Sequence, residues 1–298
     1  MLKQVVVAGR QNCIVLLLAI LIAMFFVGAG CAKAQGDTYR HLERKLVRAG
    51  FSRPMVDSAF RSASPPMFHL VCDTMRTGLG PPSYAHFLAP SEIATARRFI
   101  EDHRYCFQEE KAEYGVDPAV ISAILLVETD FGAFTGKTPV LAVFSSFAIM
   151  DRKANRDRVW WSLSPQDRKN WGRKAFDKKL IERSAWAYRQ LCALFELEET
   201  RAMSVASLRG SVMGAIGWPQ FLPTSLVKYG VDGNGDGRID LNEAPDAIFS
   251  IANYLRAYGW CQAKTFPQKE AVIFGYNHST PYVLTVLGIA KRTSEELR

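Results

Sequence analysis

Apolar and polar residues follow one another along most of the chain with the spacing of α-helices. Apolar residues that recur at i, i+3, i+4 and i+7 give a helix one hydrophobic face. This spacing occurs over residues 39–48, 54–61, 90–114, 119–129, 177–197, 244–258 and 281–290. Alternating β-branched residues are scarce, and only 271–274 has a weak strand pattern. The pattern therefore predicts a mainly α protein.

The first 34 residues have the pattern of a secretory signal peptide. Lys3 and Arg10 precede an apolar run over 14–29, and Ala-Lys-Ala at 32–34 suits a cleavage site. The run is shorter than the about 20 residues that span a bilayer, which favours a cleaved signal over a retained anchor. A lipoprotein signal ending at Cys31, with an outer-membrane lipid anchor, is the alternative. Both patterns predict export to the periplasm.

Two breaks in the pattern divide the rest of the chain. The proline-rich stretch 64–66 and the glycine- and proline-rich stretch 78–82 mark a break between an N-terminal helical arm and the rest of the chain. We expect the whole arm over 35–110 and a core over 111–298. Segment 151–179 is rich in Arg, Lys and Trp, and we expect it to form a surface excursion.

Composition and charge narrow the function classes. Of 298 residues, 48% are hydrophobic and 22% charged, which is typical of globular proteins and excludes long disordered or fibrous tracts. The net charge of +8 becomes +5 without residues 1–34. An exported, mildly basic protein is neither a transcription factor nor a cytosolic enzyme, and we expect no nucleic-acid partner.

Four cysteines lie beyond the predicted signal peptide. An even number in an oxidising compartment predicts two disulfides, for which three pairings are open. Proximity along the chain favours Cys72–Cys106 and Cys192–Cys261. No cysteine and histidine cluster with zinc-site spacing is present.

Glu128 carries the first chemical signal. Asp117 and Pro118 are typical of a helix start, and Gly132 of a helix end. Between them, Glu128 shares a helix face with apolar residues, so its carboxyl is partly desolvated and its pKa raised. A carboxylic acid that stays protonated near neutral pH suits general acid catalysis of glycoside cleavage. The alternative is a glutamate that pairs with a buried arginine or caps a neighbouring backbone.

Residues 232–243 match the calcium-binding EF-hand loop D-x-[DN]-x-[DN]-G-x5-E without a gap. The ligands that this pattern assigns are the side chains of Asp232, Asn234, Asp236, Asp240 and Glu243 and the carbonyl of Arg238. Gly237 permits the sharp turn, and Ile239 is expected to point into the core. A polar turn without metal is the alternative. One unpaired loop in an exported protein indicates a structural Ca²⁺ site and not a sensor.

Two further segments mix small, amide and aromatic residues, as carbohydrate-binding clefts do. Residues 210–225 include Ser211 and Gln220, whose side chains suit hydrogen bonds to sugar hydroxyl or acetamido groups. Residues 276–279, together with Tyr282, again combine aromatic rings with an amide. Taken alone, the first segment is also typical of a tightly packed turn and the second of an ordinary polar loop.

Taken together, these motifs resemble the membrane-bound lytic murein transglycosylase B family, glycoside hydrolase family 103. The matching blocks run in family order from residue 84 to the C-terminus: 127–129, 136–138, 210–223, the calcium loop and 276–280. The resemblance implies a lysozyme-like α-helical core that cleaves the MurNAc–GlcNAc β-1,4 bond of peptidoglycan. It implies Glu128 as the single catalytic acid and base, with no cofactor for catalysis and the glycan strand as partner of a monomer. The substrate-binding residues that it implies are Tyr84, Ser211, Gln220, Tyr254, Tyr276, Asn277 and Tyr282.

The implied reaction forms a 1,6-anhydroMurNAc end, because the MurNAc C6 hydroxyl attacks the anomeric carbon. Two other classes stay open: a hydrolytic muramidase of the same fold, and a non-catalytic, calcium-stabilised peptidoglycan-binding module. The sequence departs from the family in one place, because only 15 residues, 261–275, stand where the family has a β-rich insertion. The outer cleft is therefore expected to differ.

Overall fold

The computed structural model describes residues 39–78, 80, 83–201 and 203–296, so the predicted signal peptide lies outside it. The chain divides into two compact units, with the boundary between Pro65 and Pro66. The first unit contains helical residues 39–48 and α2 (Arg53–Arg61), and the rings of Tyr39 and Phe60 pack 5.3 Å apart in its core. No described helix is both long enough and apolar enough to cross a membrane.

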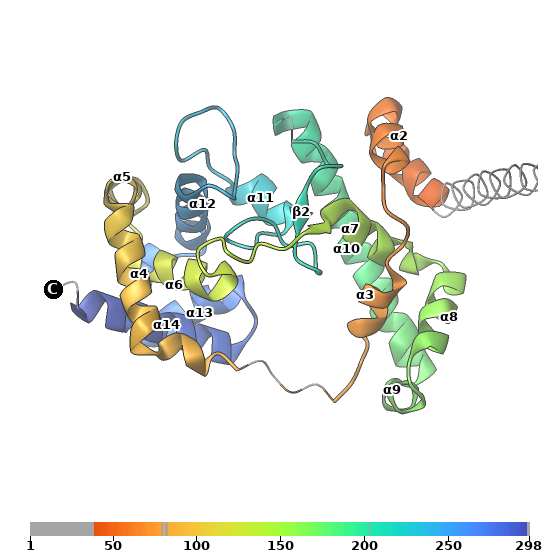
Figure 1. The fold of residues 1–298 in the computed structure, drawn as a ribbon. Helices are drawn as coiled ribbons and strands as arrows, with labels where there is room; N and C mark the ends of the chain where they lie inside the picture. The colour runs from red at the N-terminus through yellow and green to blue at the C-terminus, as the bar shows by residue number, and fades with distance from the viewer. Residues whose placement is uncertain (1–38, 79, 81–82, 202, 297–298) are drawn as a thin grey trace, which may run out of the picture. The chain divides into compact units, whose positions relative to one another are not determined.

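The second unit is built almost entirely of helices (Figure 1), which confirms the prediction of a mainly α protein. Its α-helices are α3 (Phe68–Asp73), α4 (Pro90–Asp102), α5 (Arg104–Tyr114), α6 (Pro118–Thr129), α7 (Val140–Ala148), α8 (Lys153–Ser162), α9 (Pro165–Trp171), α10 (Arg173–Arg201), α11 (Pro223–Tyr229), α12 (Ala244–Ala257), α13 (Phe266–Tyr276) and α14 (Thr280–Glu296). Short 3₁₀ helices are η1 (Ala85–Leu88), η2 (Ile149–Asp151) and η3 (Trp260–Gln262). Of the α-helices of this unit, α4, α6, α9, α11, α12, α13 and α14 carry a proline at their first or second position, where a missing N–H costs nothing.

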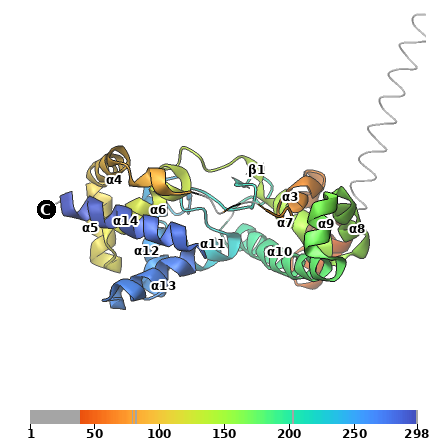
Figure 2. The ribbon, with the colours of Figure 1, turned by 90° about the horizontal axis from the view of Figure 1, so that it is seen from below.

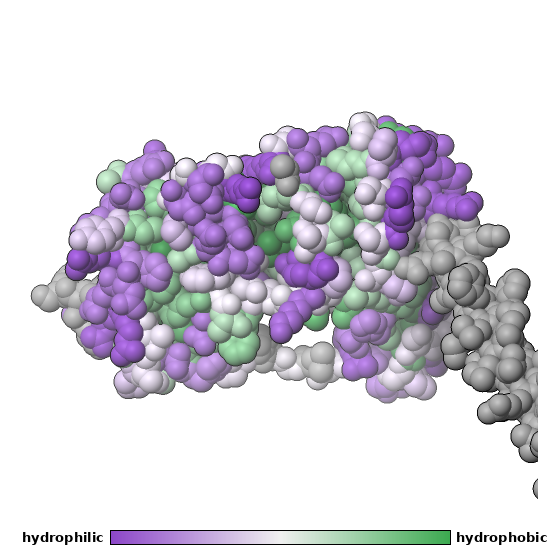
Figure 3. Space-filling view, turned by 45° about the horizontal axis from the view of Figure 1, so that its top comes forward, coloured by the Kyte–Doolittle hydropathy of each residue, from purple (hydrophilic) through white to green (hydrophobic). Residues whose placement is uncertain are grey.

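Two helices lie at the centre of this unit. Residues 119–126 of α6 are buried on every side, because α4, α12 and α14 pack around them. Every residue of α7 is buried as well, and α7 packs along the long helix α10 (Figure 2). On the face drawn in Figure 3, hydrophilic residues cover most of the outer surface and hydrophobic residues are seen mainly in its recessed middle.

The described residues form one sheet, of two strands only. Strand β1 (Thr138–Pro139) pairs antiparallel with β2 (Arg209–Gly210), with Thr138 opposite Gly210. A side chain at Gly136 would overlap the backbone of Gly210, so the two turns approach each other as closely as glycine allows. This pairing joins the segment after α6 to the segment after α10.

Two predicted elements differ from the structure, and a third, the segment expected as a surface excursion, is helical. The helix expected over 90–114 is interrupted at His103, whose backbone leaves the helical region at φ −110° and ψ 24°. Residues 271–274 belong to helix α13 and not to a strand, because α13 packs its apolar face on α14. Segment 151–179 folds into α8, α9 and the start of α10, and these helices bury Val159, Leu163 and Phe176.

The prediction of two disulfides is wrong for this structure. Cys72, Cys106, Cys192 and Cys261 form no disulfide bond with one another. Instead, the Cys261 thiol donates to the carbonyl of Tyr114 at 3.2 Å, and Cys106 lies on α5 where burial raises its pKa to about 12. Proximity along the chain is a poor guide here, because the four cysteines lie on four different elements, α3, α5, α10 and η3.

Candidate active site around Glu128

Glu128 lies in the last turn of α6. The helix begins where the sequence predicts, because the Asp117 carboxylate accepts a hydrogen bond from the amide of Ala119 at 3.0 Å and Pro118 follows as the first helical residue. While residues 119–126 are enclosed, Glu128 is only partly exposed at the end of the helix. The buried helix therefore presents one carboxyl group at the edge of the core.

The chain after Glu128 has an unusual backbone. Asp130, Phe131 and Gly132 all have positive φ, at 49°, 52° and 89°. Such a run is rare for residues with side chains and is typical of sites where surrounding structure holds a strained backbone. The ring of Phe131 stacks on that of Phe99 at 4.3 Å, which supports the strained turn from one side.

Thr129 and Trp218 hold the other side of this turn. The Thr129 hydroxyl donates to the carbonyl of Trp218 at 2.9 Å and accepts from the amide of Gly132 at 3.1 Å. A side chain at Gly132 would overlap the Trp218 indole, so only glycine fits there. These contacts attach the end of α6 to segment 210–223 and so fix the position of Glu128 relative to it.

Three tyrosines from distant parts of the chain surround the Glu128 carboxyl. Tyr84 precedes η1, Tyr276 ends α13 and Tyr282 lies in the first turn of α14. The rings of Tyr84 and Tyr282 meet edge to face at 5.8 Å, and the Tyr276 hydroxyl donates to the carbonyl of Pro219 at 2.6 Å. Burial raises the pKa of each of these phenols, and the charge of Glu128 raises it further. All three therefore remain protonated, and because the Tyr276 hydroxyl donates to Pro219, Tyr84 and Tyr282 are the donors left for this site.

Burial raises the pKa of Glu128 to about 7, because the charged carboxylate loses hydration. The Tyr282 hydroxyl lies close to the carboxyl and opposes this effect. That hydroxyl is buried and has no hydrogen-bond partner of regular geometry among the described residues. Nor does any described carboxylate contribute to the pKa of Glu128. Both protonation states of Glu128 are thus accessible near neutral pH, so the same group can give up and take back a proton.

The other residues predicted to bind substrate lie at different depths around this centre. Gln220 adopts positive φ, and its amide donates to the carbonyls of Gly217 at 2.9 Å and Thr135 at 3.3 Å. The Ser211 hydroxyl accepts from backbone amides of its own turn, the nearer at 3.1 Å. Tyr254 is buried behind Tyr276, with ring centroids 4.9 Å apart, and interacts with other tyrosines rather than with Glu128.

Asn277 ends helix α13 next to Tyr276 and is partly exposed. Its side chain makes no hydrogen bond with any part of the chain that the structure describes, so its amide is available to a ligand.

The predicted calcium loop lies between α11 and α12. The Asp232 carboxylate accepts hydrogen bonds from the amides of Gly235 at 2.7 Å and Gly237 at 2.8 Å. The Asn234 side chain donates to Glu243 at 2.8 Å, so the third and twelfth positions of the loop lie together. Among residues 39–78, 80, 83–201 and 203–296, no three Asp, Glu, His or Cys side chains are grouped closely enough to hold a metal ion.

Asp246, which the sequence analysis did not single out, fastens this loop. It is buried, and its two carboxylate oxygens accept from the amides of Gly233 at 2.8 Å and Asp240 at 2.6 Å. In the sequence, the only feature that marks Asp246 is its place in the first turn of a helix. Acidic residues are favoured there in any helix, so this feature does not reveal its contacts with the loop. Contrary to the prediction, Ile239 is half exposed, and Leu241 is the loop residue that enters the core.

Comparison with known proteins identifies the family. The family described as "Transglycosylase SLT domain" matches residues 34–269, which is most of the chain. The chain belongs to this family. The matched range includes Glu128 and its strained turn, segment 210–223 and the calcium loop, but ends before the Tyr276 block.

The individual relatives of this transglycosylase-domain protein have low sequence identity to it. It is 26% identical over 213 residues to the membrane-bound lytic murein transglycosylase B of Escherichia coli (strain K12), which covers 70% of the chain. The chain spans about half, 51%, of that curated relative.

Two solved structures share the fold at low sequence identity. The Escherichia coli lytic transglycosylase Slt35, solved in complex with calcium, superposes with a TM-score of 0.67 at 20% identity, covering 87% of this chain and 93% of that one. SltB3 from Pseudomonas aeruginosa, solved with NAG-anhNAM-pentapeptide, gives 0.66 at 21% identity, covering 87% and 80%.

Proposed function

We propose that this protein is a lytic transglycosylase that cleaves the MurNAc–GlcNAc β-1,4 bond of peptidoglycan and leaves a 1,6-anhydroMurNAc end. The observation that carries the proposal is the environment of Glu128. Its pKa is raised to about 7 by burial, and no second carboxylate acts on it in the described part of the chain. Glycosidases that use a protein nucleophile or a base for water place a second carboxylate about 5–10 Å from the acid.

The proposed reaction uses the same carboxyl group twice. Protonated Glu128 gives its proton to the glycosidic oxygen as the bond to the MurNAc anomeric carbon breaks, and the GlcNAc hydroxyl leaves. The muramyl acetamido oxygen stabilises the positive charge at that carbon. Glu128, now a carboxylate, removes the proton of the MurNAc C6 hydroxyl, whose oxygen bonds to the anomeric carbon and closes the ring. A pKa of about 7 suits both steps, because neither protonation state is strongly favoured.

The tyrosines around Glu128 have a role in this scheme. The buried hydroxyl of Tyr282 lies close to the carboxyl and lacks another partner among the described residues, so it can donate to the carboxylate after the first step. Tyr84 supplies a further protonated hydroxyl beside the same group. We assign Gln220, Ser211 and Asn277 to hydrogen bonds with the sugars, and Tyr254 to support of Tyr276.

The relatives support this substrate class. The curated relative is a murein transglycosylase, and SltB3 was solved with a fragment of the kind that the proposed reaction produces. Because the chain spans only 51% of the curated relative, the activity and substrate are proposed for it and not transferred.

Digestion of purified peptidoglycan sacculi, followed by mass spectrometry, tests the proposal. We expect muropeptides with anhydro ends, each lighter by one water than the reducing-end form. Glu128→Gln should abolish the reaction, whereas Asp130→Asn, which changes an exposed carboxylate two residues away and keeps a residue that tolerates positive φ, should retain it. Reducing ends would establish a muramidase, and cleavage by Glu128→Gln would refute the role of this residue.

We also propose that residues 232–243 bind one structural Ca²⁺ through Asp232, Asn234, Asp236, Arg238, Asp240 and Glu243. The residues present suit the ion, because they are oxygen donors in a loop closed between its third and twelfth positions, with Gly237 at φ 85°. Added Ca²⁺ should raise the melting temperature and EDTA should lower it. An unchanged melting temperature in both conditions would refute the site.

We propose that the chain is exported to the periplasm and acts as a monomer. Export would use a cleaved signal peptide over 1–34, and the alternative is a lipoprotein anchored at Cys31. Mass determination of the mature protein purified from an envelope fraction distinguishes a cleaved form that starts at residue 35 from a lipidated one.

A further inference from the structure

Most of the excess positive charge of the chain lies in one segment outside the candidate active site. Residues 151–179 contain ten Lys and Arg but only four Asp, whereas the entire chain has a net charge of +8. In the structure this segment forms the end of η2, the helices α8 and α9, and the first turns of α10. We call residues 151–179 the basic tip. Figures 1 and 2 place α8, α9 and the start of α10 together, with α7 and the rest of α10 between them and α6.

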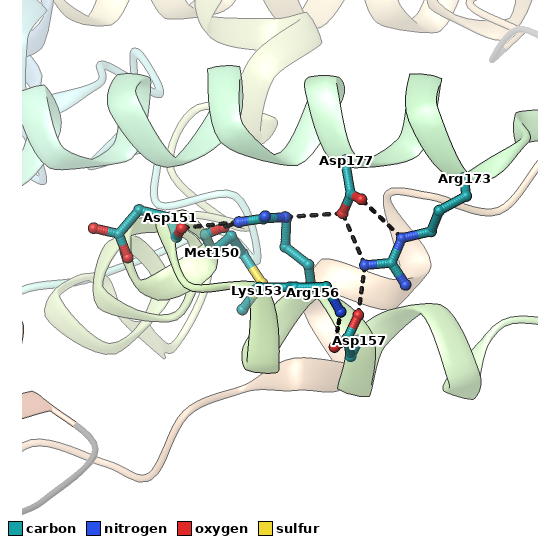
Figure 4. Close-up of polar contacts among 7 residues, drawn as sticks. All are labelled: Met150, Asp151, Lys153, Arg156, Asp157, Arg173 and Asp177. Carbon is teal, nitrogen blue, oxygen red and sulfur yellow. Dashed lines mark hydrogen bonds and ion pairs between the residues drawn. The ribbon is translucent and has the colours of Figure 1, made fainter.

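A network of ion pairs inside the basic tip uses two of its four acidic residues (Figure 4). The Asp177 carboxylate accepts from Arg156 at 2.9 Å and from Arg173 at 2.8 Å, and Asp157 accepts from Lys153 at 2.7 Å and from Arg173. Arg156 is buried and also donates to the carbonyls of Met150 and Asp151, both at 2.8 Å. The network therefore ties α8 to α10 and holds the tip rigid.

A third acidic residue of the tip, Asp167, is held by hydrogen bonds outside this network. Ser164 caps α9, and the Asp167 carboxylate in the first turn accepts from the Ser164 hydroxyl at 2.6 Å and from the amide and hydroxyl of Thr77 at 2.8 Å. These hydrogen bonds keep the pKa of Asp167 at about 2. One carboxylate oxygen of Asp151 is buried. Three of the four acidic side chains of the tip, those of Asp157, Asp167 and Asp177, are thus held by hydrogen bonds within the protein.

Seven basic residues of the tip form no ion pair with any residue that the structure describes. They are Arg152, Arg158, Arg168, Lys169, Lys174, Lys178 and Lys179. All of them except Arg168 are exposed, and Arg168 lies 5.3 Å above the ring of Trp161. Trp161 itself is 72% exposed, which is unusual for so large an apolar side chain.

This combination suits an anionic polymer with sugar rings better than a lipid bilayer. Exposed cations attract carboxylates, and an exposed indole packs against the apolar face of a sugar or inserts into a membrane interface. Insertion needs a continuous apolar face, but Trp161 is the only large hydrophobic side chain exposed in the tip, while Val159, Leu163 and Phe176 are buried.

We propose that the basic tip is a second peptidoglycan-binding surface, distinct from the cleft at Glu128. Its cations bind carboxylates of the stem peptides, and Trp161 packs against the glycan of the same or a neighbouring strand. This inference rests on the proposed function, because that function supplies the polymer. The rigid ion-pair network lets the tip hold the enzyme on an insoluble substrate while the cleft acts on one bond.

Binding to purified sacculi in the Glu128→Gln background, which keeps the polymer intact, tests the proposal. The tip variant Lys169→Gln/Lys174→Gln/Lys178→Gln should bind about tenfold more weakly at low salt, since three surface charges each contribute about 0.5 kcal/mol. The matched control Arg98→Gln/Arg189→Gln/Lys291→Gln removes the same charge from exposed positions elsewhere and should bind within about twofold of the parent. Trp161→Ala should also weaken binding, and all melting temperatures should stay close to the parent's.

Two substrate controls identify the ligand. Glycan strands stripped of stem peptides should bind parent and tip variant equally, and phosphatidylglycerol vesicles should bind neither. Equal binding of parent and tip variant to intact sacculi, a tip effect that persists on stripped glycan, or tip-dependent binding to vesicles would each overturn the proposal. Because binding is measured without cleavage, failure of the proposed reaction appears separately, as the absence of anhydro products from the unmutated enzyme.

Discussion

Glu110 is a buried acid that the proposed chemistry does not use. It lies on α5, and its side chain is 0% exposed. Neither carboxyl oxygen has a hydrogen-bond partner of regular geometry among the described residues, although the nearby amide of Val116 favours the charged form. Burial is the dominant effect and raises the pKa of Glu110 to about 8.

This pKa makes the stability of the protein depend on pH. In the unfolded chain Glu110 releases its proton near its ordinary pKa of 4.5, but in the folded protein it keeps the proton until about pH 8. The unfolded state thus binds fewer protons in this range, and the free energy of unfolding falls as pH rises from about 4.5 to about 8. At about 1.4 kcal/mol for each pKa unit, the upper limit of this loss is about 5 kcal/mol. Local rearrangement and water entry relieve a buried charge, so we expect about 2 kcal/mol.

Glu110→Gln removes this titration and keeps the shape of the side chain. Thermal unfolding at about pH 5 and about pH 9 should show the melting temperature of the unmutated protein falling by about 4–8 °C more than that of the variant. The buried amide lowers the free energy of unfolding of the variant by the same amount at both pH values. The informative quantity is therefore the difference between the melting temperatures at the two pH values. Glu109→Gln, which changes the exposed neighbour, should follow the unmutated protein. Parallel pH dependence of Glu110→Gln and the unmutated protein would refute a buried, protonated Glu110.

Three further predictions concern the active site and the calcium loop. Gly132→Ala should lower the free energy of unfolding by about 2–4 kcal/mol in denaturant titrations, because a Cβ overlaps Trp218 and φ is 89°; a change below about 0.5 kcal/mol would contradict the close approach. Asp246→Ala should cost about 1–3 kcal/mol by the same measurement, because it leaves the amides of Gly233 and Asp240 without their acceptor, and Asp246→Asn should cost less. The kcat/KM for soluble glycan should fall above about pH 7 as Glu128 loses its proton, and Tyr282→Phe should move that limb to higher pH, because the Tyr282 hydroxyl lowers the pKa; a limb that stays in place or moves to lower pH would exclude this interaction.

The sequence by itself determined the mainly helical character of the protein and the positions of several helix starts. Helical spacing and prolines at helix starts depend on neighbours along the chain, which is why α6 begins at Pro118 as expected. The same reasoning failed at His103, where one non-helical residue divides α4 from α5. It also failed over 271–274, because packing on α14 favours a helix there. The cysteine pairing also failed, because it depends on distances through space that spacing along the chain does not give.

Tertiary structure alone decided what surrounds Glu128. Tyr84 and Tyr282 are far apart in sequence, and they meet beside the carboxyl only because α14 packs against α6 and η1. Burial by the elements packed around it raises the pKa of Glu128 to about 7, and the Tyr282 hydroxyl opposes this shift. The physical reason is that periodicity encodes which face of a helix is apolar, but desolvation depends on which other elements cover that face. The same reason explains the basic tip, where the composition is visible in the sequence but only the fold shows which charges are paired inside.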